Sequence, residues 1–287
     1  MIRIGPAGWN YKDWAGLVYP KKRPSGFSEP GYLANYFDTL EINTSFYGPP
    51  SPSAARKWIE AVHHNSRFRF TAKLWRGFTH ERNATANDER LFKDGMEPIA
   101  SADLLGAVLA QFPISFKNQP GNLTYLRALA ARFREYALVV EIRHASWNEE
   151  KTIEALSDLG IGLCNIDQPL LGRALRPSAR ATSPVGYIRL HGRNYKNWFS
   201  ENTQSHERYD YLYSIDELDP WADRIKTVSS QTSDTYVISN NHYLGKAAVN
   251  ALELISILCG RPAKAPQILL ESYAELKQFA ISEPCEP

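Results

Sequence analysis

Cysteine is scarce in this 287-residue sequence, and the three that occur, Cys164, Cys259 and Cys285, lie far apart along the chain. They are too few and too scattered for a disulfide framework or a cysteine-rich zinc site, which suits a reducing compartment. Neither sign of charge is in excess, because 33 Lys and Arg against 31 Asp and Glu give a formal net charge of +2. No global field draws the protein onto nucleic acid or a membrane, so any basic site must be local.

Long hydrophobic runs are also missing. The longest apolar run, around Leu104 to Ala110, is far shorter than the roughly 20 residues of a membrane helix. The chain begins with Met1-Ile2-Arg3 at the start of an expected strand, with no apolar signal segment. We therefore expect a soluble, cytoplasmic protein with no membrane partner. Motifs such as G-x-G-x-x-G after a strand, Walker A, H-E-x-x-H and G-x-S-x-G do not occur, so a nucleotide cofactor has no support.

Short β-type runs alternate with polar, helix-like stretches, which is typical of βα units and a parallel sheet. The expected strands are Ile2 to Ile4, Thr39 to Ile42, Phe68 to Ala72, Leu105 to Ala110, Ala137 to Glu141, Gly162 to Asn165, Tyr187 to Leu190, and Tyr236 to Ile238. Helical patterns are clearest over Pro52 to Val62, Leu123 to Tyr136 and Ala247 to Ile255. This order predicts an α/β protein: a single (β/α)8 TIM-type barrel over residues 1–261. Residues 262–287 are expected to be a short C-terminal extension, helical over Leu269 to Phe279 and frayed at the end.

Polar side chains follow nearly every expected strand, and in such barrels the functional face lies at the carboxyl ends of the strands. The candidate site residues at these positions are Trp9, Glu41, Asn43, Tyr47, Lys73, His80, Gln111, Glu141, Arg143, His144, Trp147, Asp167, Arg189, His191, Asn240, Asn241 and His242. Glu, Lys, Arg, His and Asn predominate over the usual turn formers, which predicts a functional mouth.

Several of these residues belong to motifs that occur in a familiar order. The motifs are Ala7-Gly8-Trp9, Glu41-Ile42-Asn43-Thr44-Ser45-Phe46-Tyr47, Gln111-Phe112-Pro113, Glu141-Ile142-Arg143-His144, Arg189-Leu190-His191-Gly192 and Asn240-Asn241-His242. Together they resemble the DUF72 (YecE-like) family from about residue 2 to residue 258. The resemblance implies a TIM-barrel fold, in agreement with the strand count, and implies no established reaction. The tail after Pro262 lies outside it.

Two carboxylates are the candidate acid and base of this mouth. Glu141 and Glu41 follow well-separated strands and could divide these roles if their environments separate their pKa values. Alternatively, each is held in a salt bridge, for which Arg143 is the obvious partner of Glu141. His191 and His242 are candidates for proton transfer. With the carboxylates they could also bind a divalent metal, although their spacing carries no metal signature.

Cations and aromatic rings suggest the kind of ligand. Lys73, Arg143 and Arg189 could hold an anion, unless they pair with Glu41, Glu141 and Asp167 and leave the mouth nearly neutral. Aromatic residues make up 12% of the chain. Trp9, Trp14, Phe46, Tyr47, Trp75, Trp147 and Trp198 follow strand ends, and we expect about half of them in the core and the rest along the mouth. The aromatic-rich segment from Gly192 to Asp234 is a candidate lid or extended loop.

The function that fits best is an enzyme whose ligand is an anionic, hydroxyl-rich or aromatic small molecule, such as a phosphorylated sugar or a nucleotide. Its chemistry would be acid–base catalysis of hydrolase or lyase type by Glu41, Glu141, His191 and His242. The other candidate site residues would bind the substrate. The alternative is a non-catalytic protein that binds nucleic acid or nucleotides through the same basic and aromatic mouth. A third possibility is a scaffold whose mouth docks a partner protein.

Overall fold

All the strands expected from the sequence are present and form one barrel. The computed structural model describes residues 1–196, 198 and 207–282, and these residues form an eight-stranded parallel sheet in the order β1-β8-β7-β6-β5-β4-β3-β2. Its strands are β1 (Ile2–Pro6), β2 (Thr39–Ile42), β3 (Arg69–Lys73), β4 (Leu105–Gln111), β5 (Leu138–Glu141), β6 (Gly162–Asp167), β7 (Val185–Leu190) and β8 (Asp234–Ser239). The two ends of this order meet where Ala7 pairs with Glu41 and the Gly8 N–H donates to the Glu41 carbonyl at 2.9 Å. The predicted TIM-type barrel is therefore confirmed.

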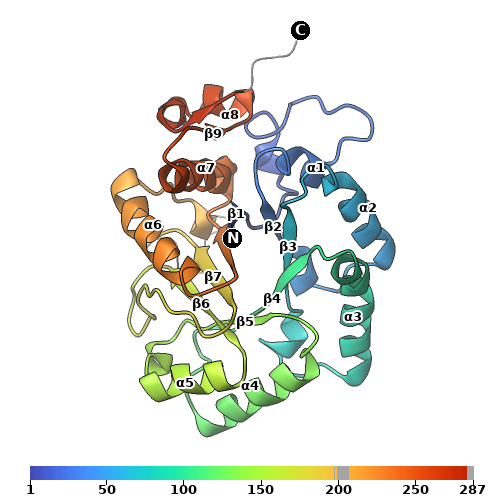
Figure 1. Ribbon diagram of the computed structural model, residues 1–287, viewed down its shortest axis with the longest axis vertical. Helices are drawn as coiled ribbons and strands as arrows, with labels where there is room; N and C mark the ends of the chain where they lie inside the picture. The colour runs from blue at the N-terminus through green and yellow to red at the C-terminus, as the bar shows by residue number, and fades with distance from the viewer. Residues whose placement is uncertain (197, 199–206, 283–287) are drawn as a thin grey trace.

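Helices surround the strands (Figure 1). They are α1 (Glu29–Leu33), α2 (Pro52–Val62), α3 (Ala86–Ser101), α4 (Pro120–Arg132), α5 (Glu150–Asp158), α6 (Ile215–Ser229) and α7 (Lys246–Cys259), with α8 (Gln267–Ser272) after the barrel. Short 3-10 turns follow the strands: η1 (Lys12–Trp14), η2 (Thr44–Phe46), η3 (Arg76–Phe78), η4 (Ala145–Trp147), η5 (Glu207–Tyr209) and η6 (Tyr243–Gly245). The expected helix start at Pro52 is confirmed, because Ser51 caps α2, and Gly260, at φ 64°, ends α7 after Cys259.

Successive side chains along each strand point alternately outward and inward, so the barrel has one apolar region between the strands and the helices and another inside the ring of strands. In β7, for example, Ile188 and Leu190 pack outward against the helices, whereas Tyr187 and Arg189 point into the barrel. Both faces are covered, so β6 is buried along its whole length. The same period of two directs Glu41 of β2 and Glu141 of β5 inward, toward Arg189.

Barrel closure depends on a glycine. Strands β1 and β2 approach so closely at Gly5 that a Cβ atom there would lie 1.8 Å from the Thr39 carbonyl oxygen. A side chain at this position is incompatible with the observed contact between β1 and β2, the two strands whose contact closes the barrel. Gly5 therefore permits the pairing that brings the loops after β1 and β2 together.

One expected βα unit lacks its helix. Residues 168–184, all of which the structure describes, connect β6 to β7 without a helix. Asn165, buried in β6, holds this connection: its Nδ2 donates to the Arg180 carbonyl at 2.9 Å, and its Oδ1 accepts from Ser178 Oγ at 2.7 Å. The prolines at 169, 177 and 184 also disfavour a helix here, because each removes a backbone donor. Side-chain hydrogen bonds thus replace helix packing at this position.

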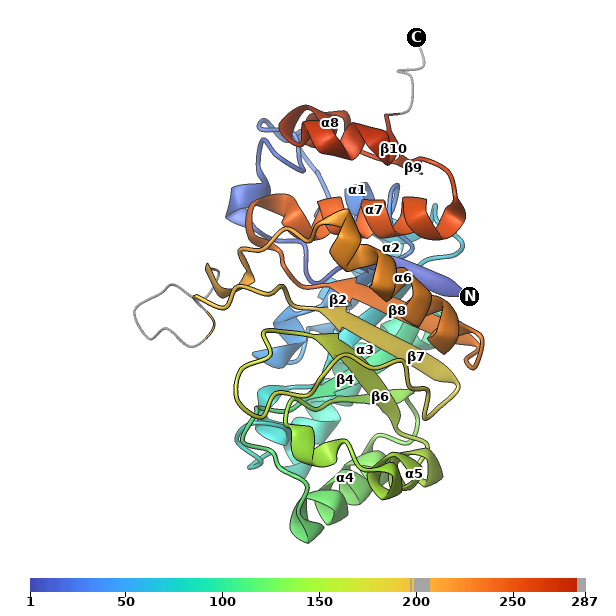
Figure 2. The same cartoon turned by 90° about the vertical axis from the view of Figure 1, so that its left-hand side faces the viewer.

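The C-terminal segment packs on the barrel. The expected helix over Leu269 to Phe279 is broken at Tyr273, which leaves the helical region so that its hydroxyl reaches the Leu244 carbonyl. The chain continues as η7 (Ala274–Gln278) and then as β10 (Ala280–Ile281), which pairs with β9 (Ala263–Lys264). Figure 2 shows α8, β9 and β10 lying on the outer side of α7. Leu269, Leu270 and Leu276 are buried in the same core as the barrel helices, while the expected frayed end, residues 283–287, lies outside the described residues.

The segment from Gly192 to Asp234 is only in part a loop. Its second half contains α6, a barrel helix whose Trp221 is fully buried. The expectation of a lid or loop over the whole segment is therefore wrong for residues 215–229. Tyr209, in η5, does reach the mouth, whereas Phe199 lies outside the described residues. None of the helices in the described ranges combines the length and the apolar character that a bilayer crossing requires.

Candidate functional site

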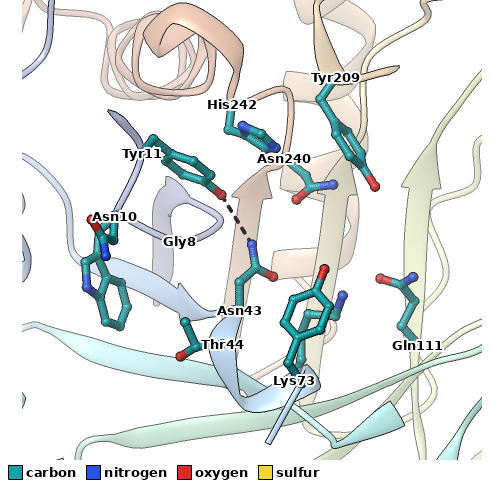
Figure 3. Close-up of a pocket in the computed structure, with 12 residues that line it drawn as sticks. Gly8, Asn10, Tyr11, Asn43, Thr44, Lys73, Gln111, Tyr209, Asn240 and His242 are labelled. Atoms are coloured by element: carbon teal, nitrogen blue, oxygen red, sulfur yellow. Dashed lines mark hydrogen bonds between the residues drawn. The ribbon is translucent and has the colours of Figure 1, made fainter. Parts of the chain in front are cut away.

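A cavity of about 250 Å³ opens at the carboxyl ends of the strands. Its walls combine amides, aromatic rings, one amine and one imidazole, contributed by segments that follow β1, β2, β3, β4 and β8 and by Tyr209 (Figure 3). The lining residues are Gly8, Trp9, Asn10, Tyr11, Asn43, Thr44, Tyr47, Lys73, Gln111, Tyr209, Asn240 and His242. The cavity lies at the face where barrel enzymes place their active sites.

The loop after β1 forms one wall. Gly8 has a φ of +76°, a conformation that other residues rarely adopt, and it turns the chain directly after the strand. Tyr11 then folds back so that its hydroxyl donates to the Ala7 carbonyl at 2.5 Å. The Tyr11 ring stacks on His242, with ring centroids 4.2 Å apart and planes inclined by 8°. This stacking holds the His242 imidazole against the cavity wall.

Lys73 projects into the cavity from the end of β3. The Ser45 hydroxyl lies 2.6 Å from the Lys73 carbonyl oxygen and 2.7 Å from that of Ile42, so it joins the loop after β2 to β3. The Nζ atom stands 4.1 Å from the centre of the Phe46 ring, and the residue is only 9% exposed. Across the described ranges, its amine makes no ion pair or hydrogen bond. Burial, together with the nearby charge of Arg189, lowers the pKa of Lys73 to about 7.

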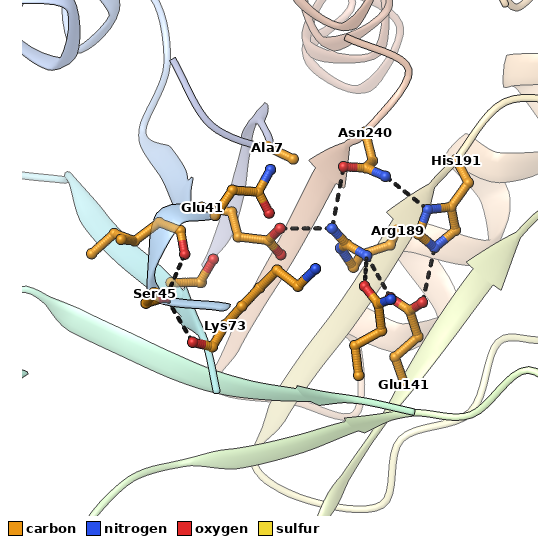
Figure 4. Close-up of polar contacts among 12 residues, drawn as sticks. Ala7, Glu41, Ser45, Lys73, Glu141, Arg189, His191 and Asn240 are labelled. Atoms are coloured by element: carbon orange, nitrogen blue, oxygen red, sulfur yellow. Dashed lines mark hydrogen bonds and ion pairs between the residues drawn. The ribbon is translucent and has the colours of Figure 1, made fainter. Parts of the chain in front are cut away.

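Directly behind the cavity floor lies a buried charge cluster centred on Arg189 (Figure 4). Its Nη2 atom is 2.7 Å from Glu41 Oε1, and its Nη1 atom is 2.6 Å from Glu141 Oε2. The guanidinium also donates to Gln111 Oε1 at 3.2 Å and to Asn240 Oδ1 at 3.3 Å, and both of these amides line the cavity. The charge cluster therefore fixes the orientation of two groups that a ligand would contact.

The second carboxylate oxygen of Glu141 is equally occupied. It lies 2.7 Å from Arg143 Nη2 and 3.1 Å from His191 Nε2. Burial works against ionisation of Glu141, but the charges around it, including Arg189 and Arg143, hold its pKa well below the usual range. Burial also lowers the pKa of His191 to about 3, so this imidazole is neutral. Its Nε2–H donates to Glu141, and its Nδ1 accepts from Asn240 Nδ2 at 2.9 Å.

The charges of the cluster balance. Glu41 and Glu141 are both fully buried and offset the charges of Arg189 and Arg143. The carboxylate pairing that the sequence left open as an alternative is therefore present for Arg143 and Arg189, but not for Lys73. Within the part of the chain that the structure describes, Lys73 is the sole Lys or Arg that lines the cavity. Any electrostatic attraction for an anion in the cavity depends mainly on that amine.

The possible metal ligands do not converge. Among the described residues, no three His, Cys, Asp or Glu side chains come together in a way that would hold a metal ion. His80 is half-buried beside Thr79 and the Phe46 ring, and His144 accepts from the Ser146 N–H and contacts its hydroxyl. His191 pairs with Glu141, whose remaining positions are taken by guanidinium groups that would repel a cation.

The family model described as "Protein of unknown function DUF72" matches residues 3–270. The chain belongs to the DUF72 family. The match extends beyond residue 258, where the resemblance seen in the sequence ends, and so includes part of the segment expected to be an extension. Because it spans β1 to β8, the DUF72 match covers every strand that contributes to the cavity.

Relatives of this DUF72 protein include the UPF0759 protein YunF of Bacillus subtilis, which is 29% identical over 273 residues, 90% of this chain and 95% of YunF. The UPF0759 protein YecE of Escherichia coli is 27% identical over 190 residues, 63% of this chain and 64% of YecE. A solved DUF72 structure from Thermotoga maritima has a TM-score of 0.77 at 34% identity and covers 90% of this chain and 99% of its own. Another, from Enterococcus faecalis, has a TM-score of 0.79 at 25% identity, with 90% and 96% covered.

Many of the site residues expected from the sequence meet in this DUF72 barrel. Seven line the cavity: Trp9, Asn43, Tyr47, Lys73, Gln111, Asn240 and His242. Glu41, Glu141, Arg189 and His191 form the charge cluster behind it, and Arg143 joins them at its edge. Of the four expected catalytic residues, His242 therefore lines the cavity, whereas Glu41, Glu141 and His191 lie behind it in the charge cluster.

Other expected site residues have structural partners elsewhere. Trp147 is buried against Phe116 and donates to its carbonyl at 2.7 Å, and Asp167 pairs with Arg193 at 2.9 Å. Asn241 donates to Asn250 Oδ1 at 2.7 Å. With His80 and His144, none of these residues lines the cavity. Among the aromatic residues expected near the mouth, Trp9, Trp14, Trp147 and Trp198 are buried, whereas Tyr47 is 74% exposed.

The sequence prediction omitted five lining residues of this DUF72 cavity: Gly8, Asn10, Tyr11, Thr44 and Tyr209. Four of them lie within two positions of a predicted site residue, so extending each strand-end motif by a few residues would have included them. Tyr209 lies in the long connection between β7 and α6, within the aromatic-rich segment that the sequence predicted as a lid or extended loop.

Proposed function

We propose that this DUF72 protein is an enzyme that binds a small hydroxyl-rich molecule of about monosaccharide size, such as a sugar or sugar phosphate, in the cavity. The composition of the cavity wall carries this proposal. Asn43, Gln111 and Asn240 present amides that both donate and accept hydrogen bonds, as sugar hydroxyls require. Aromatic faces such as that of Tyr47 provide flat apolar contact for a sugar ring.

The size of the cavity supports the same conclusion. Sites for drug-sized ligands span roughly 300–1,000 Å³, and this cavity has about 250 Å³. A sugar or a sugar phosphate fits such a volume, whereas a polymer would have to extend far outside it. The pairing of Arg143 and Arg189 with carboxylates also removes most of the positive charge that a nucleic-acid site needs.

Lys73 and His242 are the two lining groups best suited to proton transfer, and they stand on opposite sides of the cavity (Figure 3). A group whose pKa lies near neutral pH transfers protons most effectively, and the pKa of Lys73 is about 7. We assign acid–base chemistry of lyase or hydrolase type to this pair. In this proposal Glu41 and Glu141 are positioning residues that act through Arg189, because their oxygens are occupied by guanidinium, imidazole and hydroxyl groups.

A ligand panel tests the proposal. Thermal-shift and calorimetric titrations would compare neutral monosaccharides, sugar phosphates and nucleoside monophosphates, since a ligand at 100 times its Kd stabilises the fold by about 2.7 kcal/mol. We expect a sugar or sugar phosphate to bind, and Tyr47→Ala to weaken it about 3- to 10-fold through loss of aromatic contact. Tyr195→Ala is the matched control, because Tyr195 is 51% exposed and does not line the cavity. The proposal fails if no sugar or sugar phosphate binds, or if the two variants behave alike.

A further inference from the structure

We infer that Lys73 is an amine nucleophile, and that the substrate of the cavity is therefore a small hydroxylated aldehyde or ketone. This inference rests on the proposed function and narrows its substrate class. It identifies the covalent bond that forms first, between Nζ of Lys73 and the carbonyl carbon of the substrate. The chemistry would then be of lyase type, because a protonated imine accepts the electron pair that is released when the bond between the α carbon and the β carbon breaks, which leaves an enamine and a carbonyl fragment.

The geometry around Lys73 suits a nucleophile better than a charge anchor. A lysine that simply supplied a charge would be expected to pair with Glu41 or Glu141, which lie in the same region of the barrel. Both carboxylates are instead bound to Arg189, at 2.7 and 2.6 Å. Within the described ranges, Nζ makes no ion pair or hydrogen bond; it lies 4.1 Å from the centre of the Phe46 ring, and Lys73 lines the cavity. Its lone pair is therefore accessible to a ligand.

The surroundings also favour the neutral amine. Burial and the adjacent Arg189 of β7 disfavour the ammonium form, and Arg143 acts in the same direction. Glu41 of β2 and Glu141 of β5 act in the opposite direction, while His80, which follows β3, is itself uncharged near neutral pH because its pKa is lowered to about 4. A lysine beside another cation in a desolvated pocket is a recognised arrangement for an amine nucleophile.

The step can be written with every atom placed. The Nζ lone pair attacks the carbonyl carbon, a C–N bond forms, and the carbonyl oxygen takes up a proton to give a carbinolamine. Loss of that hydroxyl as water, with one further proton taken from solvent and one N–H proton released, leaves a protonated imine. The net reaction joins the amine, the carbonyl compound and one proton to give the iminium ion and one water. His242, across the cavity, is positioned to exchange protons with the departing oxygen.

The test is reductive trapping on the full-length wild-type protein. Dihydroxyacetone and glyceraldehyde serve as probes in the presence of cyanoborohydride, whose hydride adds to the imine carbon and makes the bond permanent. Peptide mapping by mass spectrometry then locates the adduct. We expect Lys73 to be labelled at least tenfold faster than the exposed Lys57 at pH 7, with a rate that rises with pH and levels off above a midpoint near 7. Lys57→Met should leave the labelling of Lys73 unchanged.

The outcomes separate this inference from the proposed function. Selective trapping at Lys73 supports the inference. If sugars bind in the calorimetric panel but Lys73 is labelled no faster than Lys57, the amine inference is overturned and the sugar site stands. If sugars neither bind nor become trapped, both fail. The experiment requires no variant at position 73, so a folding defect cannot obscure the result.

Discussion

At the scale of single residues, Arg189 forms the centre of the buried charge cluster. It is fully buried and holds the equally buried Glu41 and Glu141 within 2.7 Å of its guanidinium nitrogens. Tyr187 lies two residues before Arg189 on β7 and points to the same side of the strand; its hydroxyl donates to the other carboxylate oxygen of Glu41 at 2.9 Å. Buried ion pairs of this kind add little net stability, but removing one partner leaves an uncompensated charge in a medium of low dielectric constant.

Replacing Arg189 with Met is therefore expected to lower the free energy of unfolding by about 3–5 kcal/mol. The deficit should shrink as the pH falls from 8 to 5, because Glu141, whose pKa is held low by the surrounding charges, can be buried as a neutral acid once Arg189 is gone. Urea denaturation at both pH values measures this. Arg127→Met is the control, since Arg127 is exposed on α4, and a change within about 0.5 kcal/mol is expected there. Equal stability of the two variants would contradict the role of the charge cluster.

At the scale of elements, α7 ties the loops of the mouth together. Asn250 Oδ1 accepts from the Tyr213 N–H at 3.0 Å and from Asn241 Nδ2 at 2.7 Å, which joins the segment before α6 to the loop after β8. Its Nδ2 donates to Glu253 Oε2 at 2.6 Å, one turn further along the helix. Burial raises the pKa of Glu253 to about 7, with the Asn250 hydrogen bond acting against the rise and Glu275 of η7 adding to it.

This carboxyl group predicts a pH dependence of stability. Between the ordinary pKa of 4.5 and the folded-state value of about 7, the folded protein binds the proton and the unfolded chain does not. Stability contributed by Glu253 therefore falls as the pH rises through that window, by at most about 1.4 kcal/mol per pH unit, and is constant above it. Glu253→Gln should become more stable relative to wild type between pH 5 and pH 8. Urea titrations measure the difference, and Glu60→Gln, at an exposed position of α2, should show none.

Closure of the barrel between β1 and β2 predicts a second effect at this scale. Gly5→Ala would place a methyl group against the Thr39 carbonyl oxygen, so we expect a loss of at least about 1–3 kcal/mol of stability or failure to fold. Gly121→Ala, in the first turn of α4, has no atom within 4 Å of the added carbon, and a stabilisation of up to about 1 kcal/mol is expected there. Thermal unfolding of both variants decides; a harmless Gly5→Ala would contradict the close approach of the strands.

At the scale of the whole molecule, charge is balanced both overall and at the mouth. The formal net charge is +2, and the arginines nearest the cavity are neutralised by carboxylates. A protein that binds nucleic acid by counterion release needs several cations that are free to meet phosphates. The alternative function of nucleic-acid binding therefore has less support from the structure than a small-molecule site.

Fluorescence anisotropy with single-stranded RNA and DNA oligonucleotides tests this difference. We expect no saturable binding at low salt, and no more than weak binding that is insensitive to the sequence of the oligonucleotide. Saturable binding whose logarithm falls linearly with the logarithm of salt concentration would instead favour the nucleic-acid alternative. Lys73→Met would then be compared with Lys57→Met, because only the first removes a cation from the mouth.

The candidate site was partly predictable because strand ends in a barrel converge. Lys73, Gln111 and Asn240 were identified from their positions after three different strands, and all three line the cavity. Tyr209 was predicted only as part of a lid or extended loop and not as a site residue, because it lies in a long connection and no local pattern encodes where such a connection returns. Trp147 and Asp167 follow strands as well, yet their side chains turn to nearby partners. A position after a strand therefore indicates the right face of the barrel without settling which side chains meet there.

The sequence by itself determined the number of strands, because β-type runs alternate with helix-like stretches eight times, and it placed Glu41, Glu141 and Arg189 at the carboxyl ends of three different strands. Only the tertiary structure decided that these three residues pair with one another and leave Lys73 facing the cavity. Their strands, β2, β5 and β7, are not neighbours in the ring, so their side chains meet only when the sheet closes on itself. Burial and charge at close range then set the protonation of Lys73, and both depend on atoms distant in the chain.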